Sequence, residues 1–122
     1  MGLFSFGSKS AENIKWVQLT NENQLPSLLE ESNHRAVMFF KHSTRCSISS
    51  MAKSRLENDW DLDEEVTPVY LDLISYRSLS NLLAEKFGVQ HESPQIILVK
   101  DGMATYDASH SQISVNDIKK SL

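Results

Sequence analysis

Five consecutive apolar residues, Ala36 to Phe40 (AVMFF), place the tightest limit on the fold of this chain. A strand points successive side chains to opposite faces, so a run with no polar residue needs apolar layers on both sides of its sheet. The chain has 122 residues, which suits one domain with one core. We therefore expect this run to be the central strand of a sheet that helices cover on both faces.

The other periodicities predict alternating strands and helices around that run. Strands are expected where β-prone residues cluster, at 16–19, 66–73, 95–100 and 103–107. Helices are expected where apolar residues recur at helical spacing: after Asn21, from near Cys46, across 79–87 and after Ser114. Asp101-Gly102 is a two-residue hairpin signal. The order β-α-β-α-β-α-β-β-α predicts an α/β fold with a mixed sheet, because crossovers join parallel strands and a hairpin joins antiparallel ones.

Charge and hydropathy limit the partners and the compartment. The net charge of −4 argues against nucleic acid as the main partner. No apolar run approaches the ~20 residues that a membrane span needs, so no membrane partner is expected. The first residues match a secretion signal poorly, so none is expected, and we interpret residues 1–13 as a flexible tail before a domain over residues 14–122. An unpaired cysteine suits a reducing compartment, so we expect a cytoplasmic protein.

The single cysteine, Cys46, lies in the segment KHSTRCSIS, between the central strand and the next helix. The chain has no second thiol, so any disulfide of Cys46 must involve another molecule. The amide groups at a helix N-terminus favour a thiolate, and those of Ile48 and Ser49 are natural donors. The neighbouring residues are polar, which favours an accessible thiol over an inert buried one.

Cations gather around this cysteine. Between residues 34 and 55 there is no acidic residue, and the cations are Arg35, Lys41, Arg45, Lys53 and Arg55. Either they form a chance cluster on a solvated face or they supply a field that favours a thiolate and an anionic partner. Arg45 is the better candidate for charge stabilisation. His42 either tunes Cys46 or is a solvated turn residue.

The order of elements resembles the thioredoxin fold. Two local features support this resemblance: a cysteine just after a buried strand, and Ser93-Pro94 just before the fourth strand, where that fold keeps a cis-proline facing the cysteine. Residues 14–122 resemble the monothiol bacilliredoxins, thioredoxin-like proteins of the bacillithiol system. The residues that carry this resemblance are Phe40 to Thr44, Cys46, Ile48, Ser49, Ser93 to Gln95, and Ile97 to Gly102. The family motif has proline where this chain has Ser47, which exchanges a stiffer turn for one more N–H group.

A one-cysteine exchange cycle follows from the lone thiol, because Ser49 occupies the position of the resolving cysteine in dithiol enzymes. A hydroxyl can donate to a thiolate but cannot attack a disulfide, so an outside thiol must release Cys46. The resemblance implies that this small thiol is bacillithiol, a co-substrate that carries carboxylates. The expected roles are catalysis by Cys46, stabilisation of the thiolate by Ser49, Ser47, Ile48 and Arg45, and substrate binding by Ser93, Pro94, Thr44, Lys41 and His42.

The expected partners are bacillithiolated client proteins, a low-molecular-weight thiol and, as a candidate, a flavin-dependent disulfide reductase. No bound cofactor is expected, and the four histidines and one cysteine show no metal-ligand spacing. Two alternatives stay open: a thioredoxin-fold binding module in which Cys46 is incidental, and a carrier of iron–sulfur clusters like some monothiol glutaredoxins. The chain lacks the glycine-phenylalanine pair that follows the cysteine in that last group.

Overall fold

The computed structural model describes residues 14–122, and the tail expected over residues 1–13 lies outside them. A five-stranded sheet has the order β1-β3-β2-β4-β5. The strands are β1 (Val17–Gln18), β2 (Ala36–His42), β3 (Val66–Asp72), β4 (Gln95–Lys100) and β5 (Met103–Ser109). The first three run parallel, whereas β4 pairs antiparallel with both β2 and β5. This is the mixed sheet that the order of elements predicts.

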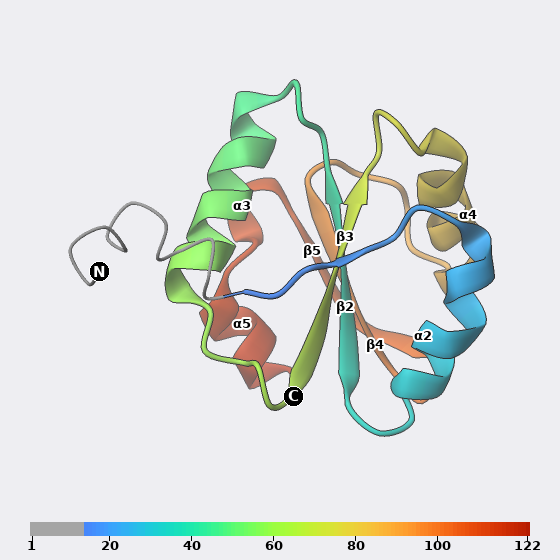
Figure 1. Ribbon diagram of the computed structural model, residues 1–122. Helices are drawn as coiled ribbons and strands as arrows, with labels where there is room; N and C mark the ends of the chain where they lie inside the picture. The colour runs from blue at the N-terminus through green and yellow to red at the C-terminus, as the bar shows by residue number, and fades with distance from the viewer. Residues whose placement is uncertain (1–13) are drawn as a thin grey trace, which may run out of the picture.

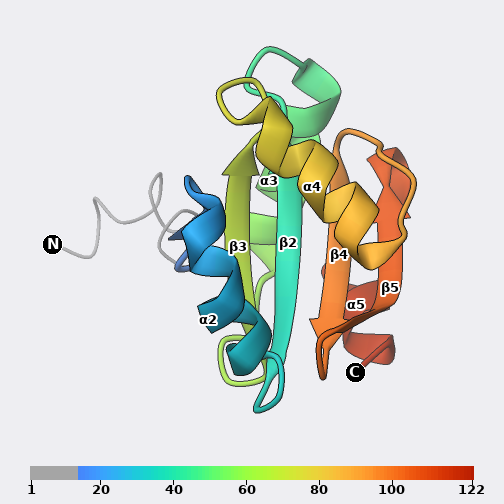
Figure 2. The same cartoon turned by 90° about the vertical axis from the view of Figure 1, so that its right-hand side faces the viewer.

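Helices cover both faces of the sheet (Figure 1). The α-helices are α2 (Leu25–Glu31), α3 (Ser47–Asp59), α4 (Arg77–Phe87) and α5 (Val115–Lys120), and two 3-10 turns are η2 (Glu22–Gln24) and η3 (His110–Gln112). Helices α3 and α5 pack on one face, and α2 and α4 pack on the other (Figures 1 and 2). A cluster of buried apolar residues lies on each face. The α/β architecture with helices on both faces of a mixed sheet is therefore confirmed.

The central strand divides its side chains between these two clusters. Met38 and Phe40 pack on the α3 and α5 face, and Val37 and Phe39 pack on the α2 and α4 face. All seven residues of β2 are buried. Burial on both faces is the reason that this segment needs an unbroken apolar run.

Local signals at the ends of the elements agree with the structure. Asn21 and Gln24 form a reciprocal capping box, and Ser114 accepts a hydrogen bond from the amide of Asp117 at the start of α5. Asp101 and Gly102 both have positive φ, at 51° and 77°, as the hairpin turn between β4 and β5 requires.

Pro68 lies inside β3, two residues after the strand begins, where it pairs with Met38 of β2. We expected it at the start of the strand or at an irregular edge. The short β1 pairs with Val69 and Tyr70, so β3 has no strand partner on that side at Pro68. A proline, which lacks an N–H group, is tolerated there because no ladder bond is lost.

The central strand is longer than expected, and this changes the surroundings of two candidate site residues. The apolar run ends at Phe40, but β2 continues to His42. Lys41 is completely buried, and His42 is 4% exposed. The interpretations of Lys41 as part of a solvated cationic patch and of His42 as a turn residue are therefore wrong. Pairing with β3 as far as Asp72 continues the strand past the end of its apolar sequence.

Candidate active site

Cys46 lies where β2 passes into α3, and it is the N-cap residue of that helix. Its backbone is extended, with φ −112° and ψ 122°. The amide of Cys46 donates to the carbonyl of Ser43 at 3.2 Å, and its carbonyl accepts from the amide of Ser50 at 3.0 Å. The residue is partly exposed, and its neighbours Arg45 and Ser47 are exposed. Cys46 is therefore partly accessible to solvent, as the polar surrounding sequence indicates.

The sulfur of Cys46 accepts no capping hydrogen bond in this structure. We expected the amides of Ile48 and Ser49 to bind it. These amides belong to the first turn of α3, where backbone N–H groups have no partner within the helix. They still place partial positive charge beside the N-cap residue, so the field that favours a thiolate does not depend on a direct bond.

Ser49 makes two hydrogen bonds that the sequence does not predict. Its side chain is completely buried. Its Oγ lies 2.7 Å from Nδ1 of His42 and accepts from the amide of Ser43 at 3.0 Å. The hydroxyl thus ties the first turn of α3 to the end of β2, a contact that the spacing between Cys46 and Ser49 does not reveal.

His42 occupies an aromatic environment at the end of β2. Its ring lies with its centroid 5.6 Å from the rings of both Phe40 and Tyr70. Burial lowers the pKa of His42 below its ordinary value of 6.5, and the nearby Lys53 ammonium acts in the same direction. The carboxylates of Asp72 and Glu57 oppose this shift in part. His42 is therefore mainly neutral at pH 7.

Ser93 and Pro94 lie at the same edge of the sheet as Cys46. Lys41 of β2 pairs with Gln95 of β4, so the residue before Gln95 is next to the end of β2 that leads to the cysteine. The Ser93–Pro94 peptide bond is cis. The carbonyl of Pro94 accepts from the amide of His110 at 3.0 Å, and the buried Oγ of Ser93 has no hydrogen-bond partner. The strand register therefore places the serine-proline pair beside the end of β2 from which the chain leads to the cysteine.

Lys41 lies on the face of the sheet opposite α3. Its Nζ is 3.3 Å from Nδ1 of His91, in the loop before β4, and Ser80 of α4 contacts the same nitrogen at 3.3 Å. Burial lowers the pKa of Lys41 to about 8, and the Arg77 guanidinium adds to this effect. Burial, with Lys41 and Arg77, also lowers the pKa of His91. Because side chains alternate along β2, Lys41 points away from the face that carries Cys46 and His42.

The remaining candidates surround the thiol at the surface. Thr44, Arg45, Ser47 and Ile48 are exposed. Ile48 and Met51, one turn apart on α3, are 55% and 62% exposed, so apolar surface lies beside the cysteine. Arg45 lies directly before Cys46 and is exposed. Its charge is therefore available to an incoming anion.

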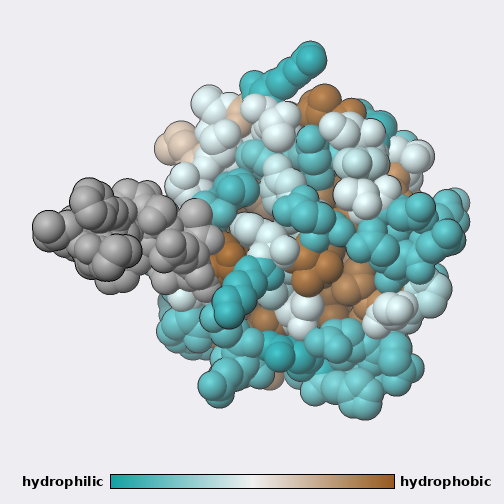
Figure 3. Space-filling view, in the orientation of Figure 1, coloured by the Kyte–Doolittle hydropathy of each residue, from teal (hydrophilic) through white to brown (hydrophobic). Residues whose placement is uncertain are grey.

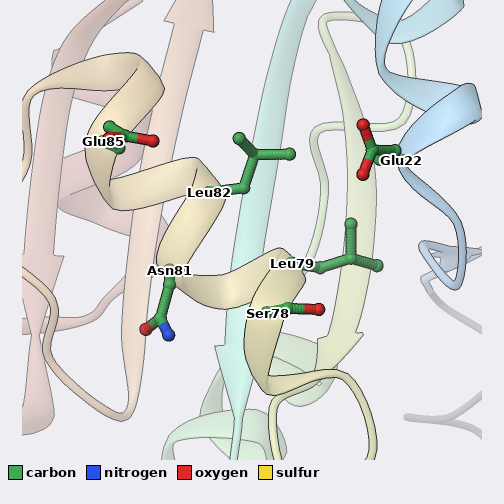
Figure 4. Close-up of a pocket in the computed structure, with 6 residues that line it drawn as sticks. All are labelled: Glu22, Ser78, Leu79, Asn81, Leu82 and Glu85. Atoms are coloured by element: carbon green, nitrogen blue, oxygen red, sulfur yellow. The ribbon is translucent and has the colours of Figure 1, made fainter.

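The rest of the surface includes a mainly polar face and a pocket that lies apart from the thiol. The face shown in Figure 3 is mainly polar, with apolar side chains in patches among the polar ones. A pocket on the side of the sheet opposite α3 opens between α4 and the segment before α2 (Figure 4). It is lined by Glu22, Ser78, Leu79, Asn81, Leu82 and Glu85. It contains neither the thiol nor the serine-proline pair.

The described residues offer neither a cluster of metal ligands nor a membrane-spanning helix. Across residues 14–122, no three His, Cys, Asp or Glu side chains come close enough together to hold a metal ion. Over the same range, every helix is too short or too polar to span a bilayer.

Ser47 can be compared with the proline of the family motif by a single substitution. Ser47 is the first residue of α3, where the amide has no acceptor within the helix and proline is favoured. The extended backbone of Cys46 also suits a residue that precedes proline. We expect Ser47→Pro to raise the free energy of unfolding by about 0.5–1 kcal/mol in urea titrations. Ser54→Pro, inside the same helix, serves as the contrast and should lose about 3 kcal/mol or more; a loss in both variants would contradict the prediction.

The fold and the site together define a class. A central mixed sheet, a cysteine at the N-terminus of the helix that follows its central strand, and a cis-proline at the adjacent strand are features of thioredoxin-fold thiol oxidoreductases. The model of the family described as monothiol bacilliredoxin BrxC matches residues 17–118, and the chain belongs to this family. Its single cysteine agrees with the monothiol description.

Solved structures agree with this assignment. A proposed oxidoreductase with a thioredoxin fold is 28% identical, with a TM-score of 0.75, over 86% of this chain and 91% of that one. Mitochondrial thioredoxin 3 from Saccharomyces cerevisiae, in its oxidised form, is 17% identical, with a TM-score of 0.69, over 91% and 94% of the two chains. A thioredoxin from Malassezia sympodialis is 13% identical, with a TM-score of 0.66, over 87% and 86%. The similarities to the two thioredoxins show the fold alone. The family match supports, in addition, thiol oxidoreductase chemistry in general.

Proposed function

We propose that this protein removes bacillithiol from mixed disulfides of client proteins by exchange at Cys46. The observation that carries the proposal is an accessible thiol at the N-cap of α3, in a chain with no second cysteine. Membership of the monothiol bacilliredoxin family supports bacillithiol as the small thiol. The proposed compartment is the cytoplasm, where free thiols persist.

The proposed cycle has two exchange steps. The Cys46 thiolate attacks the bacillithiol sulfur of the mixed disulfide, the client leaves as its thiolate, and Cys46 becomes bacillithiolated. A second bacillithiol thiolate then attacks the bacillithiol sulfur on Cys46, which releases the Cys46 thiolate and bacillithiol disulfide. A flavin-dependent disulfide reductase is the proposed source of the two electrons that return bacillithiol disulfide to the thiol. In this scheme bacillithiol is a co-substrate, and neither exchange step needs a bound cofactor.

The proposed substrate contacts follow from the positions of the exposed groups. Thr44 and Arg45 directly precede Cys46 and are exposed, and they suit the polar groups and the carboxylates of bacillithiol, respectively. The edge at Ser93 and Pro94 suits the backbone of an extended client segment, in the manner of an added strand. Ile48 and Met51 offer apolar surface to the same client. Lys41 and His42 are buried, so neither is proposed to contact the substrate directly.

A mass-spectrometric exchange assay tests the proposal. A purified client with one accessible cysteine is loaded with bacillithiol, mixed with the protein, and followed by intact mass. We expect the client to lose the bacillithiol mass while Cys46 gains it, and free bacillithiol then to restore Cys46. The same client loaded with glutathione measures the preference for the small thiol. A client that keeps its bacillithiol while Cys46 stays unmodified would contradict the proposal and favour the binding-module alternative.

A further inference from the structure

The Ser49 hydroxyl connects His42 to the helix turn that carries Cys46. A serine hydroxyl has one hydrogen to donate and two lone pairs that accept. The amide of Ser43 donates into one lone pair at 3.0 Å, so one lone pair and the hydrogen remain. The 2.7 Å contact with Nδ1 of His42 uses one of these two, and the position of the imidazole proton decides which.

Two arrangements of this contact are possible. When Nδ1 of His42 lacks a proton, the Ser49 hydroxyl donates to it and has no hydrogen left for another acceptor. This arrangement agrees with the structure, in which the hydrogen bonds of the Ser49 hydroxyl go to His42 and Ser43. When Nδ1 carries the proton, it donates into the second lone pair of Oγ, and the hydroxyl hydrogen must turn to a different acceptor.

Cys46 provides that acceptor once it is ionised. Cys46 is the N-cap residue of α3 and Ser49 is the third helical residue, from which a side chain can reach back to the N-cap residue, as it does in a capping box. Ser49 is completely buried, which excludes bulk water from its hydroxyl. A thiolate carries a full negative charge, and hydrogen bonds to charged acceptors are stronger than those to neutral ones.

The surroundings of His42 allow its proton to move between its two nitrogens. The charged and titratable groups around it are Lys53 and Glu57 of α3 and Asp72 and Tyr70 of β3. Burial and Lys53 lower the pKa of His42, so the ring is mainly neutral at pH 7 and carries one proton. A negative charge on the sulfur favours the tautomer with that proton on Nδ1, because this tautomer frees the Ser49 hydroxyl.

We propose that His42 is a positioning residue that acts on Cys46 through Ser49: with its proton on Nδ1, it turns the Ser49 hydroxyl toward the thiolate. The inference deepens the proposed function and rests on it for the identity of the reacting sulfur, but not for the identity of the small thiol. His42 is not a general base in this arrangement, since Ser49 lies between it and the reactive group.

A double-mutant cycle on the rate of Cys46 alkylation by iodoacetamide tests this inference. His42→Phe keeps an aromatic ring between Phe40 and Tyr70 but removes the hydrogen bond, and Ser49→Ala removes the hydroxyl. At pH 6.5 we expect each variant to react about threefold more slowly, because loss of the bond reduces the thiolate fraction more than it raises intrinsic nucleophilicity. The double variant should be no slower than either single variant, since both remove the same interaction.

Measurements at high pH separate positioning from structural damage. At pH 10, more than one unit above the ordinary thiol pKa of ~8.5, the variants without the hydrogen bond should react as fast as or faster than the wild type. A disturbed helix turn would instead slow the reaction at both pH values. His42→Asn, whose side-chain N–H can replace Nδ1–H, should recover the rate at pH 6.5. Thermal unfolding and near-ultraviolet circular dichroism verify the fold of each variant.

Three results would overturn the inference: multiplicative effects of the two substitutions, slowing at pH 10, or a wild-type rate for Ser49→Ala at pH 6.5. Iodoacetamide contains no bacillithiol, so the cycle remains interpretable if removal of bacillithiol fails. The opposite outcome is also distinguishable. If the protein removes bacillithiol but the effects of the two substitutions on the alkylation rate are multiplicative, the proposed function stands and the role of His42 is rejected.

Discussion

Replacement of Cys46 by serine is expected to reduce exchange to the uncatalysed rate. The serine hydroxyl keeps the size and the capping position of the side chain, but it is not ionised near neutral pH and does not attack disulfides. The chain has no other thiol to take over, because Cys46 is its single cysteine. The assay is the loss of bacillithiol from a loaded client, followed by intact mass.

The matched control for this substitution is Ser54→Ala. Ser54 is exposed on the same helix, about two turns from the thiol. We expect this variant to exchange at the wild-type rate. If Cys46→Ser retained a substantial part of the wild-type activity, the exchange could not proceed through the sulfur, and the proposed function would fail. If both variants were inactive, disturbance of α3 would explain the loss, and circular dichroism would reveal it.

Substitution of Lys41 by methionine is expected to stabilise the protein near pH 7. Lys41 is completely buried, and its pKa is lowered to about 8 from its ordinary value of 10.5. A lysine with a lower pKa in the folded chain binds fewer protons there than in the unfolded chain between these two values. Its destabilising effect is therefore complete below about pH 8 and is lost as the pH rises toward 10.5. Methionine fills a similar volume without a charge, so the gain at pH 7 is on the order of 2 kcal/mol.

Urea titrations at pH 7 and at pH 9.5 check this expectation. The stability difference between Lys41→Met and the wild type should be largest at pH 7 and should shrink at pH 9.5. Lys86→Met, an exposed position on α4, removes the same formal charge and should show no such dependence. A Lys41→Met variant that is less stable than the wild type at both pH values would show that the contact with His91 outweighs the cost of burial.

Most of the fold could be predicted because its signals are local. The five apolar residues from Ala36 to Phe40 indicate a strand buried on both faces, and Asp101-Gly102 indicates the hairpin. The capping box at Asn21 involves only residues 21–24, so its signal is local. Such features depend on residues that are close together in the sequence. The side chains of these residues restrict the local backbone conformation.

The site was predictable in its residues but not in their contacts. Cys46 and Pro94 stand out in the sequence, and the register of β2 with β4 brings them to one edge of the sheet. The partners of Ser49 were not predicted, because the turn between His42 and Cys46 decides which groups its hydroxyl meets. A possible signal was the alternation Phe40-Lys41-His42, which extends the strand by two residues and places His42 on the face that α3 covers.

The sequence by itself determined the order of strands and helices, the single thiol at a helix start, and the family to which the chain belongs. Tertiary structure decided which polar groups are buried and what they contact. Lys41 and His91 are fifty residues apart, and only the packing of α4 and its following loop against the sheet brings them within 3.3 Å. The hydrophobic pattern within a helix or strand decides which of its faces is buried, and this pattern spans only a few residues. The environment of a charged group depends instead on all the segments that fold around it.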